Sequence, residues 1–304
     1  MANLKEVRTR IESVNSTKQI TSAMKMVAAS KLRKSQNAIM ALRPYAEKFG
    51  EILHRLLAVS SQQSMVPELV EGKSSYFDKL SDQMASVLIV PLSSNKGLCG
   101  AFNANIIRET INLIKDEYQD LLDNNRIDIL CVGSKVEESL KFKKYPVIGN
   151  ENVLFDDLTY ENAAAFAERL MKNFEDKKYD KIIFVYNQFK NAATQVLVKE
   201  QFLPIVGQQS TVDGHQSEVD YIYQPNKEEL LSSMLPKSLK LQVYKILLDS
   251  FASEQGARMI SMTQATDNAT ELLKELNLSY NKARQSAITN ELVEIVSGAN
   301  ALKG

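Results

Sequence analysis

The fold of this chain is decided by its N-terminal stretch, residues 4–36, LKEVRTRIESVNSTKQITSAMKMVAASKLRKSQ. The stretch has neither glycine nor proline and is rich in Ala, Lys, Met, Leu and Arg, which favour a helix. Its apolar residues alternate at spacings of three and four, as at Leu4, Val7 and Ile11, which is the spacing of a narrow coiled-coil seam. The pattern predicts a long N-terminal helix over 1–59 that packs against a partner helix along this seam.

The end of this helix is marked by a proline and by a polar segment. Pro44 has no N–H to donate and its ring clashes with the preceding turn, so we expect it to kink the helix or to end it at Arg43. Residues 60–83 are polar and include Pro67 and Gly72, which predicts a connector.

The middle of the chain, 84–208, changes to short apolar runs that are rich in β-branched residues. Helical stretches at about 101–123 and 160–177 separate the first three runs, and this alternation indicates a doubly wound, Rossmann-like α/β head domain. We expect the last run to be antiparallel, at an edge of the sheet. The four runs are Ala85–Pro91, Ile127–Val132, Lys181–Asn187 and Thr194–Phe202.

A loop over 209–225 leads to a second long helical segment, 226–304, with an apolar stripe from Leu235 to Leu302. Neither terminal helix can bury its stripe alone. We therefore expect an antiparallel coiled coil of the N- and C-terminal helices, with the α/β head inserted between them. Helices of this length extend beyond the head, so their outer parts need a sleeve of other chains or stand free in water.

The composition is that of a folded protein without membrane spans. The 304 residues are 44% hydrophobic and 24% charged. There is no apolar run of about 18 residues and no apolar signal core at the start, so we expect neither direct membrane insertion nor secretion. Cys99 and Cys131 form no CxxC motif, which fits a reducing compartment with neither a disulfide nor a metal site.

Positive charge gathers at the N-terminus although the net charge of the chain is zero. Residues 1–50 carry ten Lys or Arg against three Glu. Such a segment suits an acidic protein partner, nucleic acid or anionic lipid, whereas on charge alone a solvated helix face is the favoured interpretation.

The sequence offers no constellation for catalysis. The turn SSNKGLCGAFN, residues 93–103, lies where α/β folds hold phosphate-binding loops, but it contains neither GxGxxG nor GxxxxGK[ST]. The two histidines, His54 and His215, have no candidate nucleophile nearby. Acidic pairs such as Glu271 and Glu275 have the spacing of a solvated helix face. We expect no catalytic residue, no cofactor and no bound metal.

Four motifs resemble those of the gamma subunit of F-type ATP synthases, in that family's order and spacing over the whole chain. They are ITSAMKMVAASKLRK (20–34), NKGLCGAFN (95–103), ARMISMTQATDNA (257–269) and YNKARQSAITNELVEIVSGA (280–299). The resemblance implies a coiled-coil shaft inside a ring of three alpha and three beta subunits, with the head on the membrane c-ring beside the epsilon subunit. It implies a non-catalytic rotor of the central stalk that couples proton or sodium flow to ATP synthesis at beta-subunit sites.

The resemblance also implies which residues make coupling contacts. Met24 and Arg258 match family positions at the bearing of the shaft, and Lys25 lies near an acidic beta-subunit loop. A further set, near the upper end of the shaft, comprises Arg284, Gln285, Thr289 and Glu291. Each of these residues could instead simply stabilise the coiled coil.

The sequence departs from the usual family pattern at two places. The family's usual Asp-Arg-Gly turn is here Asn95-Lys96-Gly97, which puts in doubt a salt bridge at position 95. The cysteine-bearing insertion of chloroplast-type members is absent, so no thiol switch is expected. A start at MANLKEV without a transit sequence favours a bacterial protein, although a mature organellar chain could look similar. For a bacterial protein the resemblance implies the cytoplasmic face of the plasma membrane.

One rival is a basic coiled-coil adaptor that binds nucleic acid through residues 5–48, and another is an α/β enzyme with helical arms. The adaptor has only Tyr45 and Phe49 nearby for base stacking, and the enzyme lacks glycine and histidine patterns in the head.

Overall fold

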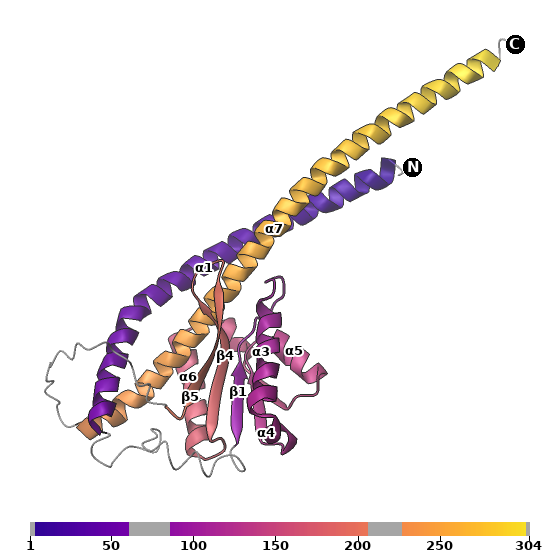
Figure 1. Ribbon diagram of the computed structural model, residues 1–304. Coiled ribbons are helices and arrows are strands. Elements are labelled where there is room, and N and C mark those ends of the chain that lie inside the picture. Colours follow the sequence, from indigo (N-terminus) through magenta and orange to yellow (C-terminus); the bar gives the residue numbers. More distant parts are fainter. Residues whose placement is uncertain (1–3, 61–85, 206–226, 302–304) are drawn as a thin grey trace. The chain divides into compact units, whose positions relative to one another are not determined.

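The computed structural model describes residues 4–60, 86–205 and 227–301. A helix of 57 residues, α1 (Leu4–Ser60), precedes an α/β region, and a helix of 75 residues, α7 (Lys227–Ala301), follows it (Figure 1). The predicted connector at 60–83, apart from Ser60 at the end of α1, and the predicted loop at 209–225 lie outside the described residues. The elements of the α/β region are β1 (Val87–Pro91), α3 (Phe102–Glu117), α4 (Gln119–Asp123), β2 (Ile127–Cys131), α5 (Ser134–Phe142), β3 (Val147–Asn150), the 3-10 helix η1 (Asn152–Phe155), α6 (Tyr160–Glu175), β4 (Lys181–Phe189) and β5 (Gln195–Leu203).

The strands form one sheet of five, in the order β3-β2-β1-β4-β5. The strands β1 to β4 are parallel, whereas β5 runs antiparallel to β4 at the edge, as predicted. The central strand β1, with the sequence VLIVP, is buried along its whole length. A continuous apolar run is what a parallel strand covered on both faces requires.

Helices cover both faces of this sheet. One core packs α3 and α5 against one face, and a second packs α6 and part of α7 against the other. Neighbouring β1 residues alternate between these cores, because successive side chains of a strand point to opposite faces. Members of the first core include Ile89, Leu113 and Val136, and members of the second include Leu88, Phe166, Phe184 and Leu247.

The predicted fold class is confirmed, since two long terminal helices flank an inserted, doubly wound α/β region. Of the two outcomes expected at Pro44, a kink or an end at Arg43, the end does not occur, because the helix continues past Pro44 to Ser60. Proline removes the N–H that would bond to the carbonyl of Met40. Both Pro44 and Met40 are exposed, so water can satisfy that carbonyl and the helix can continue.

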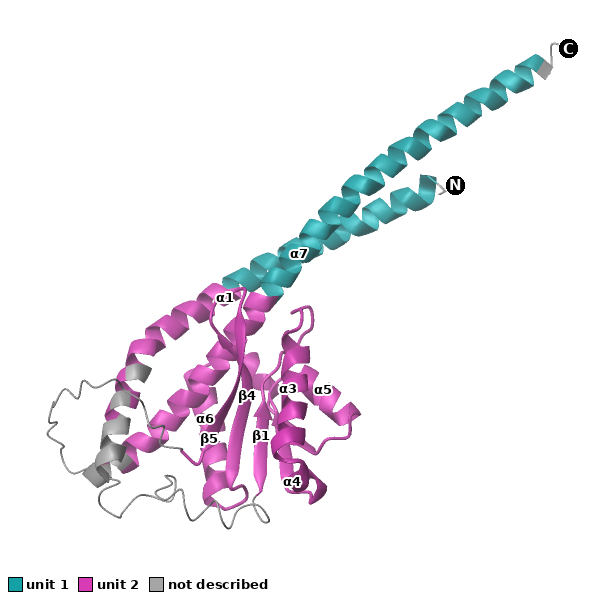
Figure 2. Cartoon of the chain, viewed as in Figure 1, with its two compact units in different colours: residues 1–30, 258–304 teal, residues 31–257 magenta. Residues whose placement is uncertain are grey.

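The chain divides into two compact units (Figure 2). Unit 1 comprises residues 1–30 and 258–304, and unit 2 comprises residues 31–257. Unit 2 therefore contains the sheet, its covering helices and the segment of α7 that closes the second core.

Candidate functional site

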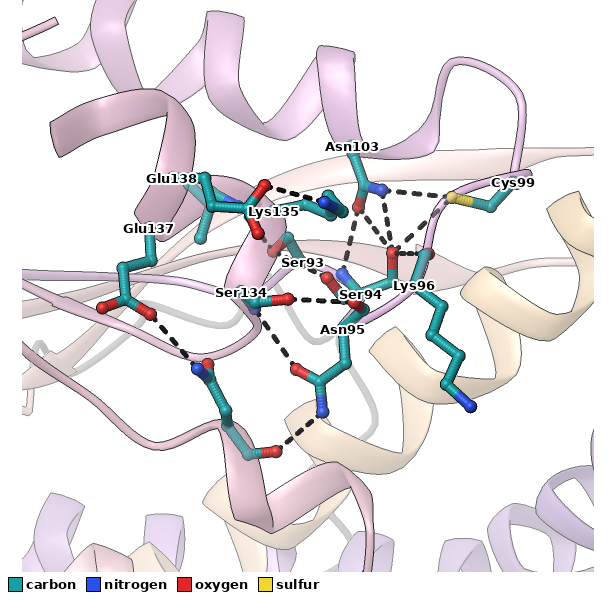
Figure 3. A network of polar contacts seen from close by, with 12 residues as sticks. Ser93, Ser94, Asn95, Lys96, Cys99, Asn103, Ser134, Lys135, Glu137 and Glu138 are labelled. Carbon is teal, nitrogen blue, oxygen red and sulfur yellow. Dashed lines mark hydrogen bonds and ion pairs between the residues drawn. The ribbon is translucent and has the colours of Figure 1, made fainter. Parts of the chain in front are cut away.

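The turn at residues 93–103 closes the carboxyl end of β1 with its own hydrogen bonds (Figure 3). The backbone N–H of Ser94 donates to Asn103 Oδ1 at 3.0 Å, and Ser94 Oγ donates to the carbonyl of Lys96 at 2.6 Å. Asn103 Nδ2 donates to Ser94 Oγ at 2.8 Å and to Cys99 Sγ at 3.2 Å. These bonds hold the turn in one conformation, and they occupy polar groups that could otherwise bind a ligand.

The N-terminus of α5 faces this turn, and the turn's side chains occupy it (Figure 3). Val136 N donates to Ser93 Oγ at 3.0 Å, and Ser134 N donates to Asn95 Oδ1 at 3.2 Å. Ser134 Oγ donates back to the Asn95 carbonyl at 2.9 Å. In phosphate-binding loops the first N–H groups of a helix point at the ligand. Here the oxygens of the protein itself accept from them.

Gly133 allows the two loops to come this close. Its φ is +106°, and a Cβ at this position would lie 2.2 Å from the carbonyl oxygen of Ser93. A side chain here would clash and would also strain the backbone, so only glycine fits. The loops after β1 and β2 therefore close the sheet edge at which open α/β folds bind their ligands.

The amide at position 95 has a structural use in this closure. Asn95 Nδ2 donates to the carbonyl of Asn152 at 2.9 Å, while its Oδ1 accepts from Ser134. An aspartate could accept but could not donate. The departure from the usual Asp-Arg-Gly turn thus replaces a carboxylate by a side chain that bonds to both neighbouring loops.

The acidic residue nearest to this network is Glu137, and its carboxylate is fully engaged. It accepts from Lys141 Nζ at 2.7 Å, from Asn150 Nδ2 at 2.8 Å and from Asn152 Nδ2 at 3.1 Å. The bond from Lys141, with help from the two amides, holds the pKa of Glu137 below its usual value. A carboxylate held in this way is a weak proton acceptor near neutral pH.

Metal binding finds no support in the ranges 4–60, 86–205 and 227–301. No three His, Cys, Asp or Glu side chains gather there as they would around a metal ion. Both cysteines are free and buried, and burial raises the pKa of the Cys131 thiol to about 12. A thiol with so high a pKa is a poor metal ligand and a poor nucleophile.

In unit 1 the first part of α1 packs against α7 (Figure 2). The seam differs from the expected one in its second part, because Ile20 and Val27 are 61% and 57% exposed while their neighbours Thr21 and Ala28 are buried. The two termini lie at the same end of this unit, so the helices are antiparallel. Val7 is buried, and the hydroxyl oxygens of Thr21 and Thr266 lie 2.9 Å apart. Because a step forward along one helix is a step back along the other, Leu4 lies opposite about residue 283.

The same register places Met24 and Arg258 near each other. Met24 faces about Thr263, which is roughly 8 Å along the helix axis from Arg258 at ~1.5 Å per residue. Met24 and Lys25 are half-buried, and Arg258 is only 8% exposed. These three predicted coupling residues therefore lie in or beside the seam.

The other predicted coupling residues, Arg284, Gln285, Thr289 and Glu291, are all exposed in the last part of α7. Thr289 Oγ1 donates to the carbonyl of Gln285 at 2.9 Å, so these two residues share a face one turn apart. The hydroxyl proton is thus used within the helix. The same bond to the carbonyl four residues back is made by Thr9, Ser16, Thr17 and Thr270.

Beyond the start of α1, the last part of α7 carries apolar side chains that no described residue covers. Each side chain is at least half exposed, with values from 50% for Ile288 to 61% for Ile295. Exposed apolar residues that follow one another along a helix mark an interaction surface. None of the helices described here is both long and apolar enough to span a membrane. The exposed residues are Ile288, Leu292, Val293, Ile295 and Val296.

Comparison with known proteins identifies the family. A family model described as ATP synthase matches residues 3–302. The ATP synthase gamma chain of Christiangramia forsetii is 52% identical over 305 residues, and the alignment covers 100% of both chains. The chain belongs to the ATP synthase gamma-chain family. The gamma chain of Flavobacterium johnsoniae is 51% identical over 304 residues, again with 100% of both chains covered. Family membership confirms the resemblance predicted from the four motifs and gives no support to the nucleic-acid adaptor.

Solved structures carry the same fold. A chain of the Euglena gracilis mitochondrial ATP synthase, from an assembly of OSCP, F1 and c-ring, aligns over 98% of this chain and 94% of its own length with a TM-score of 0.65. Its identity of 22% makes it evidence of the gamma-chain fold alone. A chain of the central stalk and c-ring of the Tetrahymena thermophila enzyme is 27% identical, with a TM-score of 0.52, over 81% of this chain and 99% of that one.

Proposed function

We propose that this chain is the rotating central shaft of a proton- or sodium-translocating ATP synthase. The observation that carries the proposal is the 52% identity with a gamma chain over the full length of both chains. Unit 1 turns inside a ring of three alpha and three beta subunits, and the sheet-containing head sits on the c-ring beside the epsilon subunit. The complex lies at the cytoplasmic face of a bacterial plasma membrane, and this chain joins the membrane only through its partners.

The chain acts without catalysing a reaction itself, because the active sites lie on the beta subunits. One asymmetric shaft inside a three-fold ring cannot contact three beta subunits alike. Its angle gives each beta subunit a different contact energy and so favours a different conformation in each. Ion flow turns the shaft and drives ATP formation and release, whereas hydrolysis turns it backward.

The residues that we propose for coupling fall into two groups. Met24, Lys25 and Arg258 act where the shaft meets the bearing and an acidic beta-subunit loop. The exposed positions Arg284, Gln285, Thr289 and Glu291 contact the upper part of the ring. A single exposed ion pair contributes only about 0–1 kcal/mol, so torque is shared among many contacts.

We also keep the predicted domains as part of this proposal. They are an N-terminal helix over 1–59, a connector over 60–83, a head over 84–208, a loop over 209–225 and a C-terminal helix over 226–304.

The experiment that tests the proposal is assembly with purified alpha and beta subunits, followed by size, ATP hydrolysis and rotation. A probe attached at Phe142→Cys suits the rotation assay, because this position is 88% exposed while the native cysteines are buried. We expect one chain per hexamer, with the probe turning during hydrolysis. A chain that lacks residues 285–304 is the matched control and should hold the hexamer less tightly. If the full chain enters no hexamer, the proposal is wrong.

A further inference from the structure

The last turn of α7 within unit 2 is met by the backbone of another element. At Gly256, a Cβ would lie 3.2 Å from the carbonyl oxygen of Ala192 and 3.4 Å from its Cα. Ala192 belongs to the tip that joins β4 to β5, 64 positions earlier in the chain. Such distances are at the tight limit of ordinary contact, so a side chain on α7 at this position would push the tip away.

The tip itself is rigid. Asn191 Oδ1 accepts from Ala193 N at 2.9 Å and from Thr194 N at 2.7 Å. Two backbone bonds between Asn191 and Thr194 close the same turn. Gln195 Nε2 donates to the carbonyl of Ala192 at 3.1 Å, so this group is also held. The tip stands at the end of two paired strands, each nine residues long.

A second part of the head holds the neighbouring residue of α7. Ala257 packs against the buried cluster of Cys99, Phe102 and Ile106, which Leu197 of β5 also contacts. Cys99 is in turn fixed by Asn103 within the network of the 93–103 turn. The helix is thus held at consecutive residues by two elements that are both anchored in the sheet.

We propose that these contacts form a collar that fixes the rotational angle of α7 in the head, so that torque passes between head and shaft at Gly256 and Ala257. The collar comprises Asn191–Thr194, Cys99 and Phe102. The helix is continuous beyond it, and from Arg258 onward it belongs to unit 1. At Gly256 the contact is with backbone atoms of Ala192, which leaves no long side chain there to relax under load, so α7 is held firmly within the head. This inference rests on the proposed function as a shaft.

The first test loosens the tip in the complete membrane-bound complex, reconstituted into vesicles. Asn191→Ala removes both side-chain bonds of the turn and leaves the two backbone bonds between Asn191 and Thr194. We expect the number of ions pumped per ATP hydrolysed to fall below that of the parent, because a looser tip holds α7 less firmly in the head. The hydrolysis rate and subunit stoichiometry should stay as in the parent, because the shaft still turns.

The matched control is Asn124→Ala, which likewise removes a bond between an asparagine side chain and the backbone, here from Asn124 Nδ2 to the carbonyl of Asp120, at an exposed turn after α4. The melting temperature is measured for both variants. A purely structural role would lower the melting temperature without lowering the coupling ratio, and the control should show only that.

The second test crowds the joint from the helix side. In Gly256→Ala and Gly256→Leu the added atoms press on Ala192, so the coupling ratio should fall further as the side chain grows. Gly50→Ala and Gly50→Leu on α1 are controls, because a Cβ there has nothing within 4 Å. If Asn191→Ala and Gly256→Leu couple as well as their controls, the collar is overturned. If the unmodified chain enters no hexamer, the proposed function fails instead.

Discussion

The two halves of α7 differ in how much of their surface the rest of the chain buries. Between Leu239 and Gly256 the helix is buried on most sides by the sheet and its other covering elements. From Arg284 to Asn300 every residue is exposed. A long helix gains most of its stability from packing rather than from intrinsic propensity. The first half is therefore stabilised by packing within the chain, whereas the described residues leave the second half uncovered.

One substitution in each half of α7 tests whether packing stabilises the two halves unequally. Leu247 is fully buried in the second core, so Leu247→Ala should destabilise the isolated chain by about 2–5 kcal/mol through lost burial and a cavity. Leu292 is 57% exposed, and Leu292→Ala should change the free energy of unfolding by only about 0.5 kcal/mol. Urea titration measures both. Equal losses would contradict the division of the helix.

The buried half of α7 contains a carboxyl group, that of Asp249, which is only 5% exposed. Burial, together with the nearby Glu200, raises its pKa to about 6, although Lys245 and Arg43 act in the opposite direction. The folded state therefore keeps its proton to a higher pH than the unfolded state does. Stability from this group is complete below about pH 4 and is lost as the pH rises through about 6.

Asp249→Asn removes that loss, so we expect it to stabilise the chain by about 1–3 kcal/mol at pH 8 and by nothing at pH 4. Thermal unfolding across this pH range is the measurement. Glu294→Gln, in the exposed half of α7, is the matched control for removing a carboxylate. A gain that is the same at both pH values would mean that the proton of Asp249 is not its source.

The Thr21–Thr266 contact probes the segment between the two halves, where α7 has one partner helix. Each hydroxyl is part-buried and also has a carbonyl of its own helix within reach, that of Lys18 for Thr21 and that of Met262 for Thr266. One hydroxyl must therefore share its proton for the pair to bond across the two helices of unit 1. We expect a double-mutant cycle of Thr21→Val and Thr266→Val to give a coupling free energy of about 1 kcal/mol. A value of zero would mean that packing alone sets the register.

The smallest expected effect is at Gly298, in the exposed half, where a Cβ meets nothing within 4 Å. Gly298→Ala should stabilise the helix by about 0.5–1 kcal/mol, since alanine loses less backbone entropy. In Gly256→Ala the added Cβ presses on Ala192, so this variant should be stabilised less than Gly298→Ala or should be destabilised. Circular dichroism during heating compares the two variants. A larger gain at Gly256 would show that the buried half has room to spare.

The sequence was a good guide to long periodic elements and a poor one to short or distant contacts. The two terminal helices, the helical stretches at 101–123 and 160–177 and the strands β1, β2, β4 and β5 were predicted, because each has a helical apolar period or a short run rich in β-branched residues. The strand β3 was missed because it has four residues, alternates between half-buried and exposed, and contains Gly149. The helix α5 was also missed, because its nine residues are too few to show a clear helical period.

The sequence predicted that the turn at 93–103 lacks a phosphate-binding motif, but it did not predict the bonds that close this edge of the sheet. Missing glycine motifs argued against a phosphate site at 93–103, and the network there agrees with that argument. The bonds that close it, such as Asn95 to Asn152, join residues 57 positions apart, and serine and asparagine look alike in any turn. The approach of Gly256 to Ala192 gave no local signal either, because only the folded chain brings them together.

The hydroxyl of Thr289, which donates within its own helix, has a consequence for friction. A turning surface that offers free donors must break and remake bonds with each neighbour it passes, and each such event adds a barrier. When the proton is already used one turn back, the surface passes its neighbours with fewer bonds to exchange. In a chain that rotates as proposed, Thr289 would thus add less than a free hydroxyl to the barriers between successive positions.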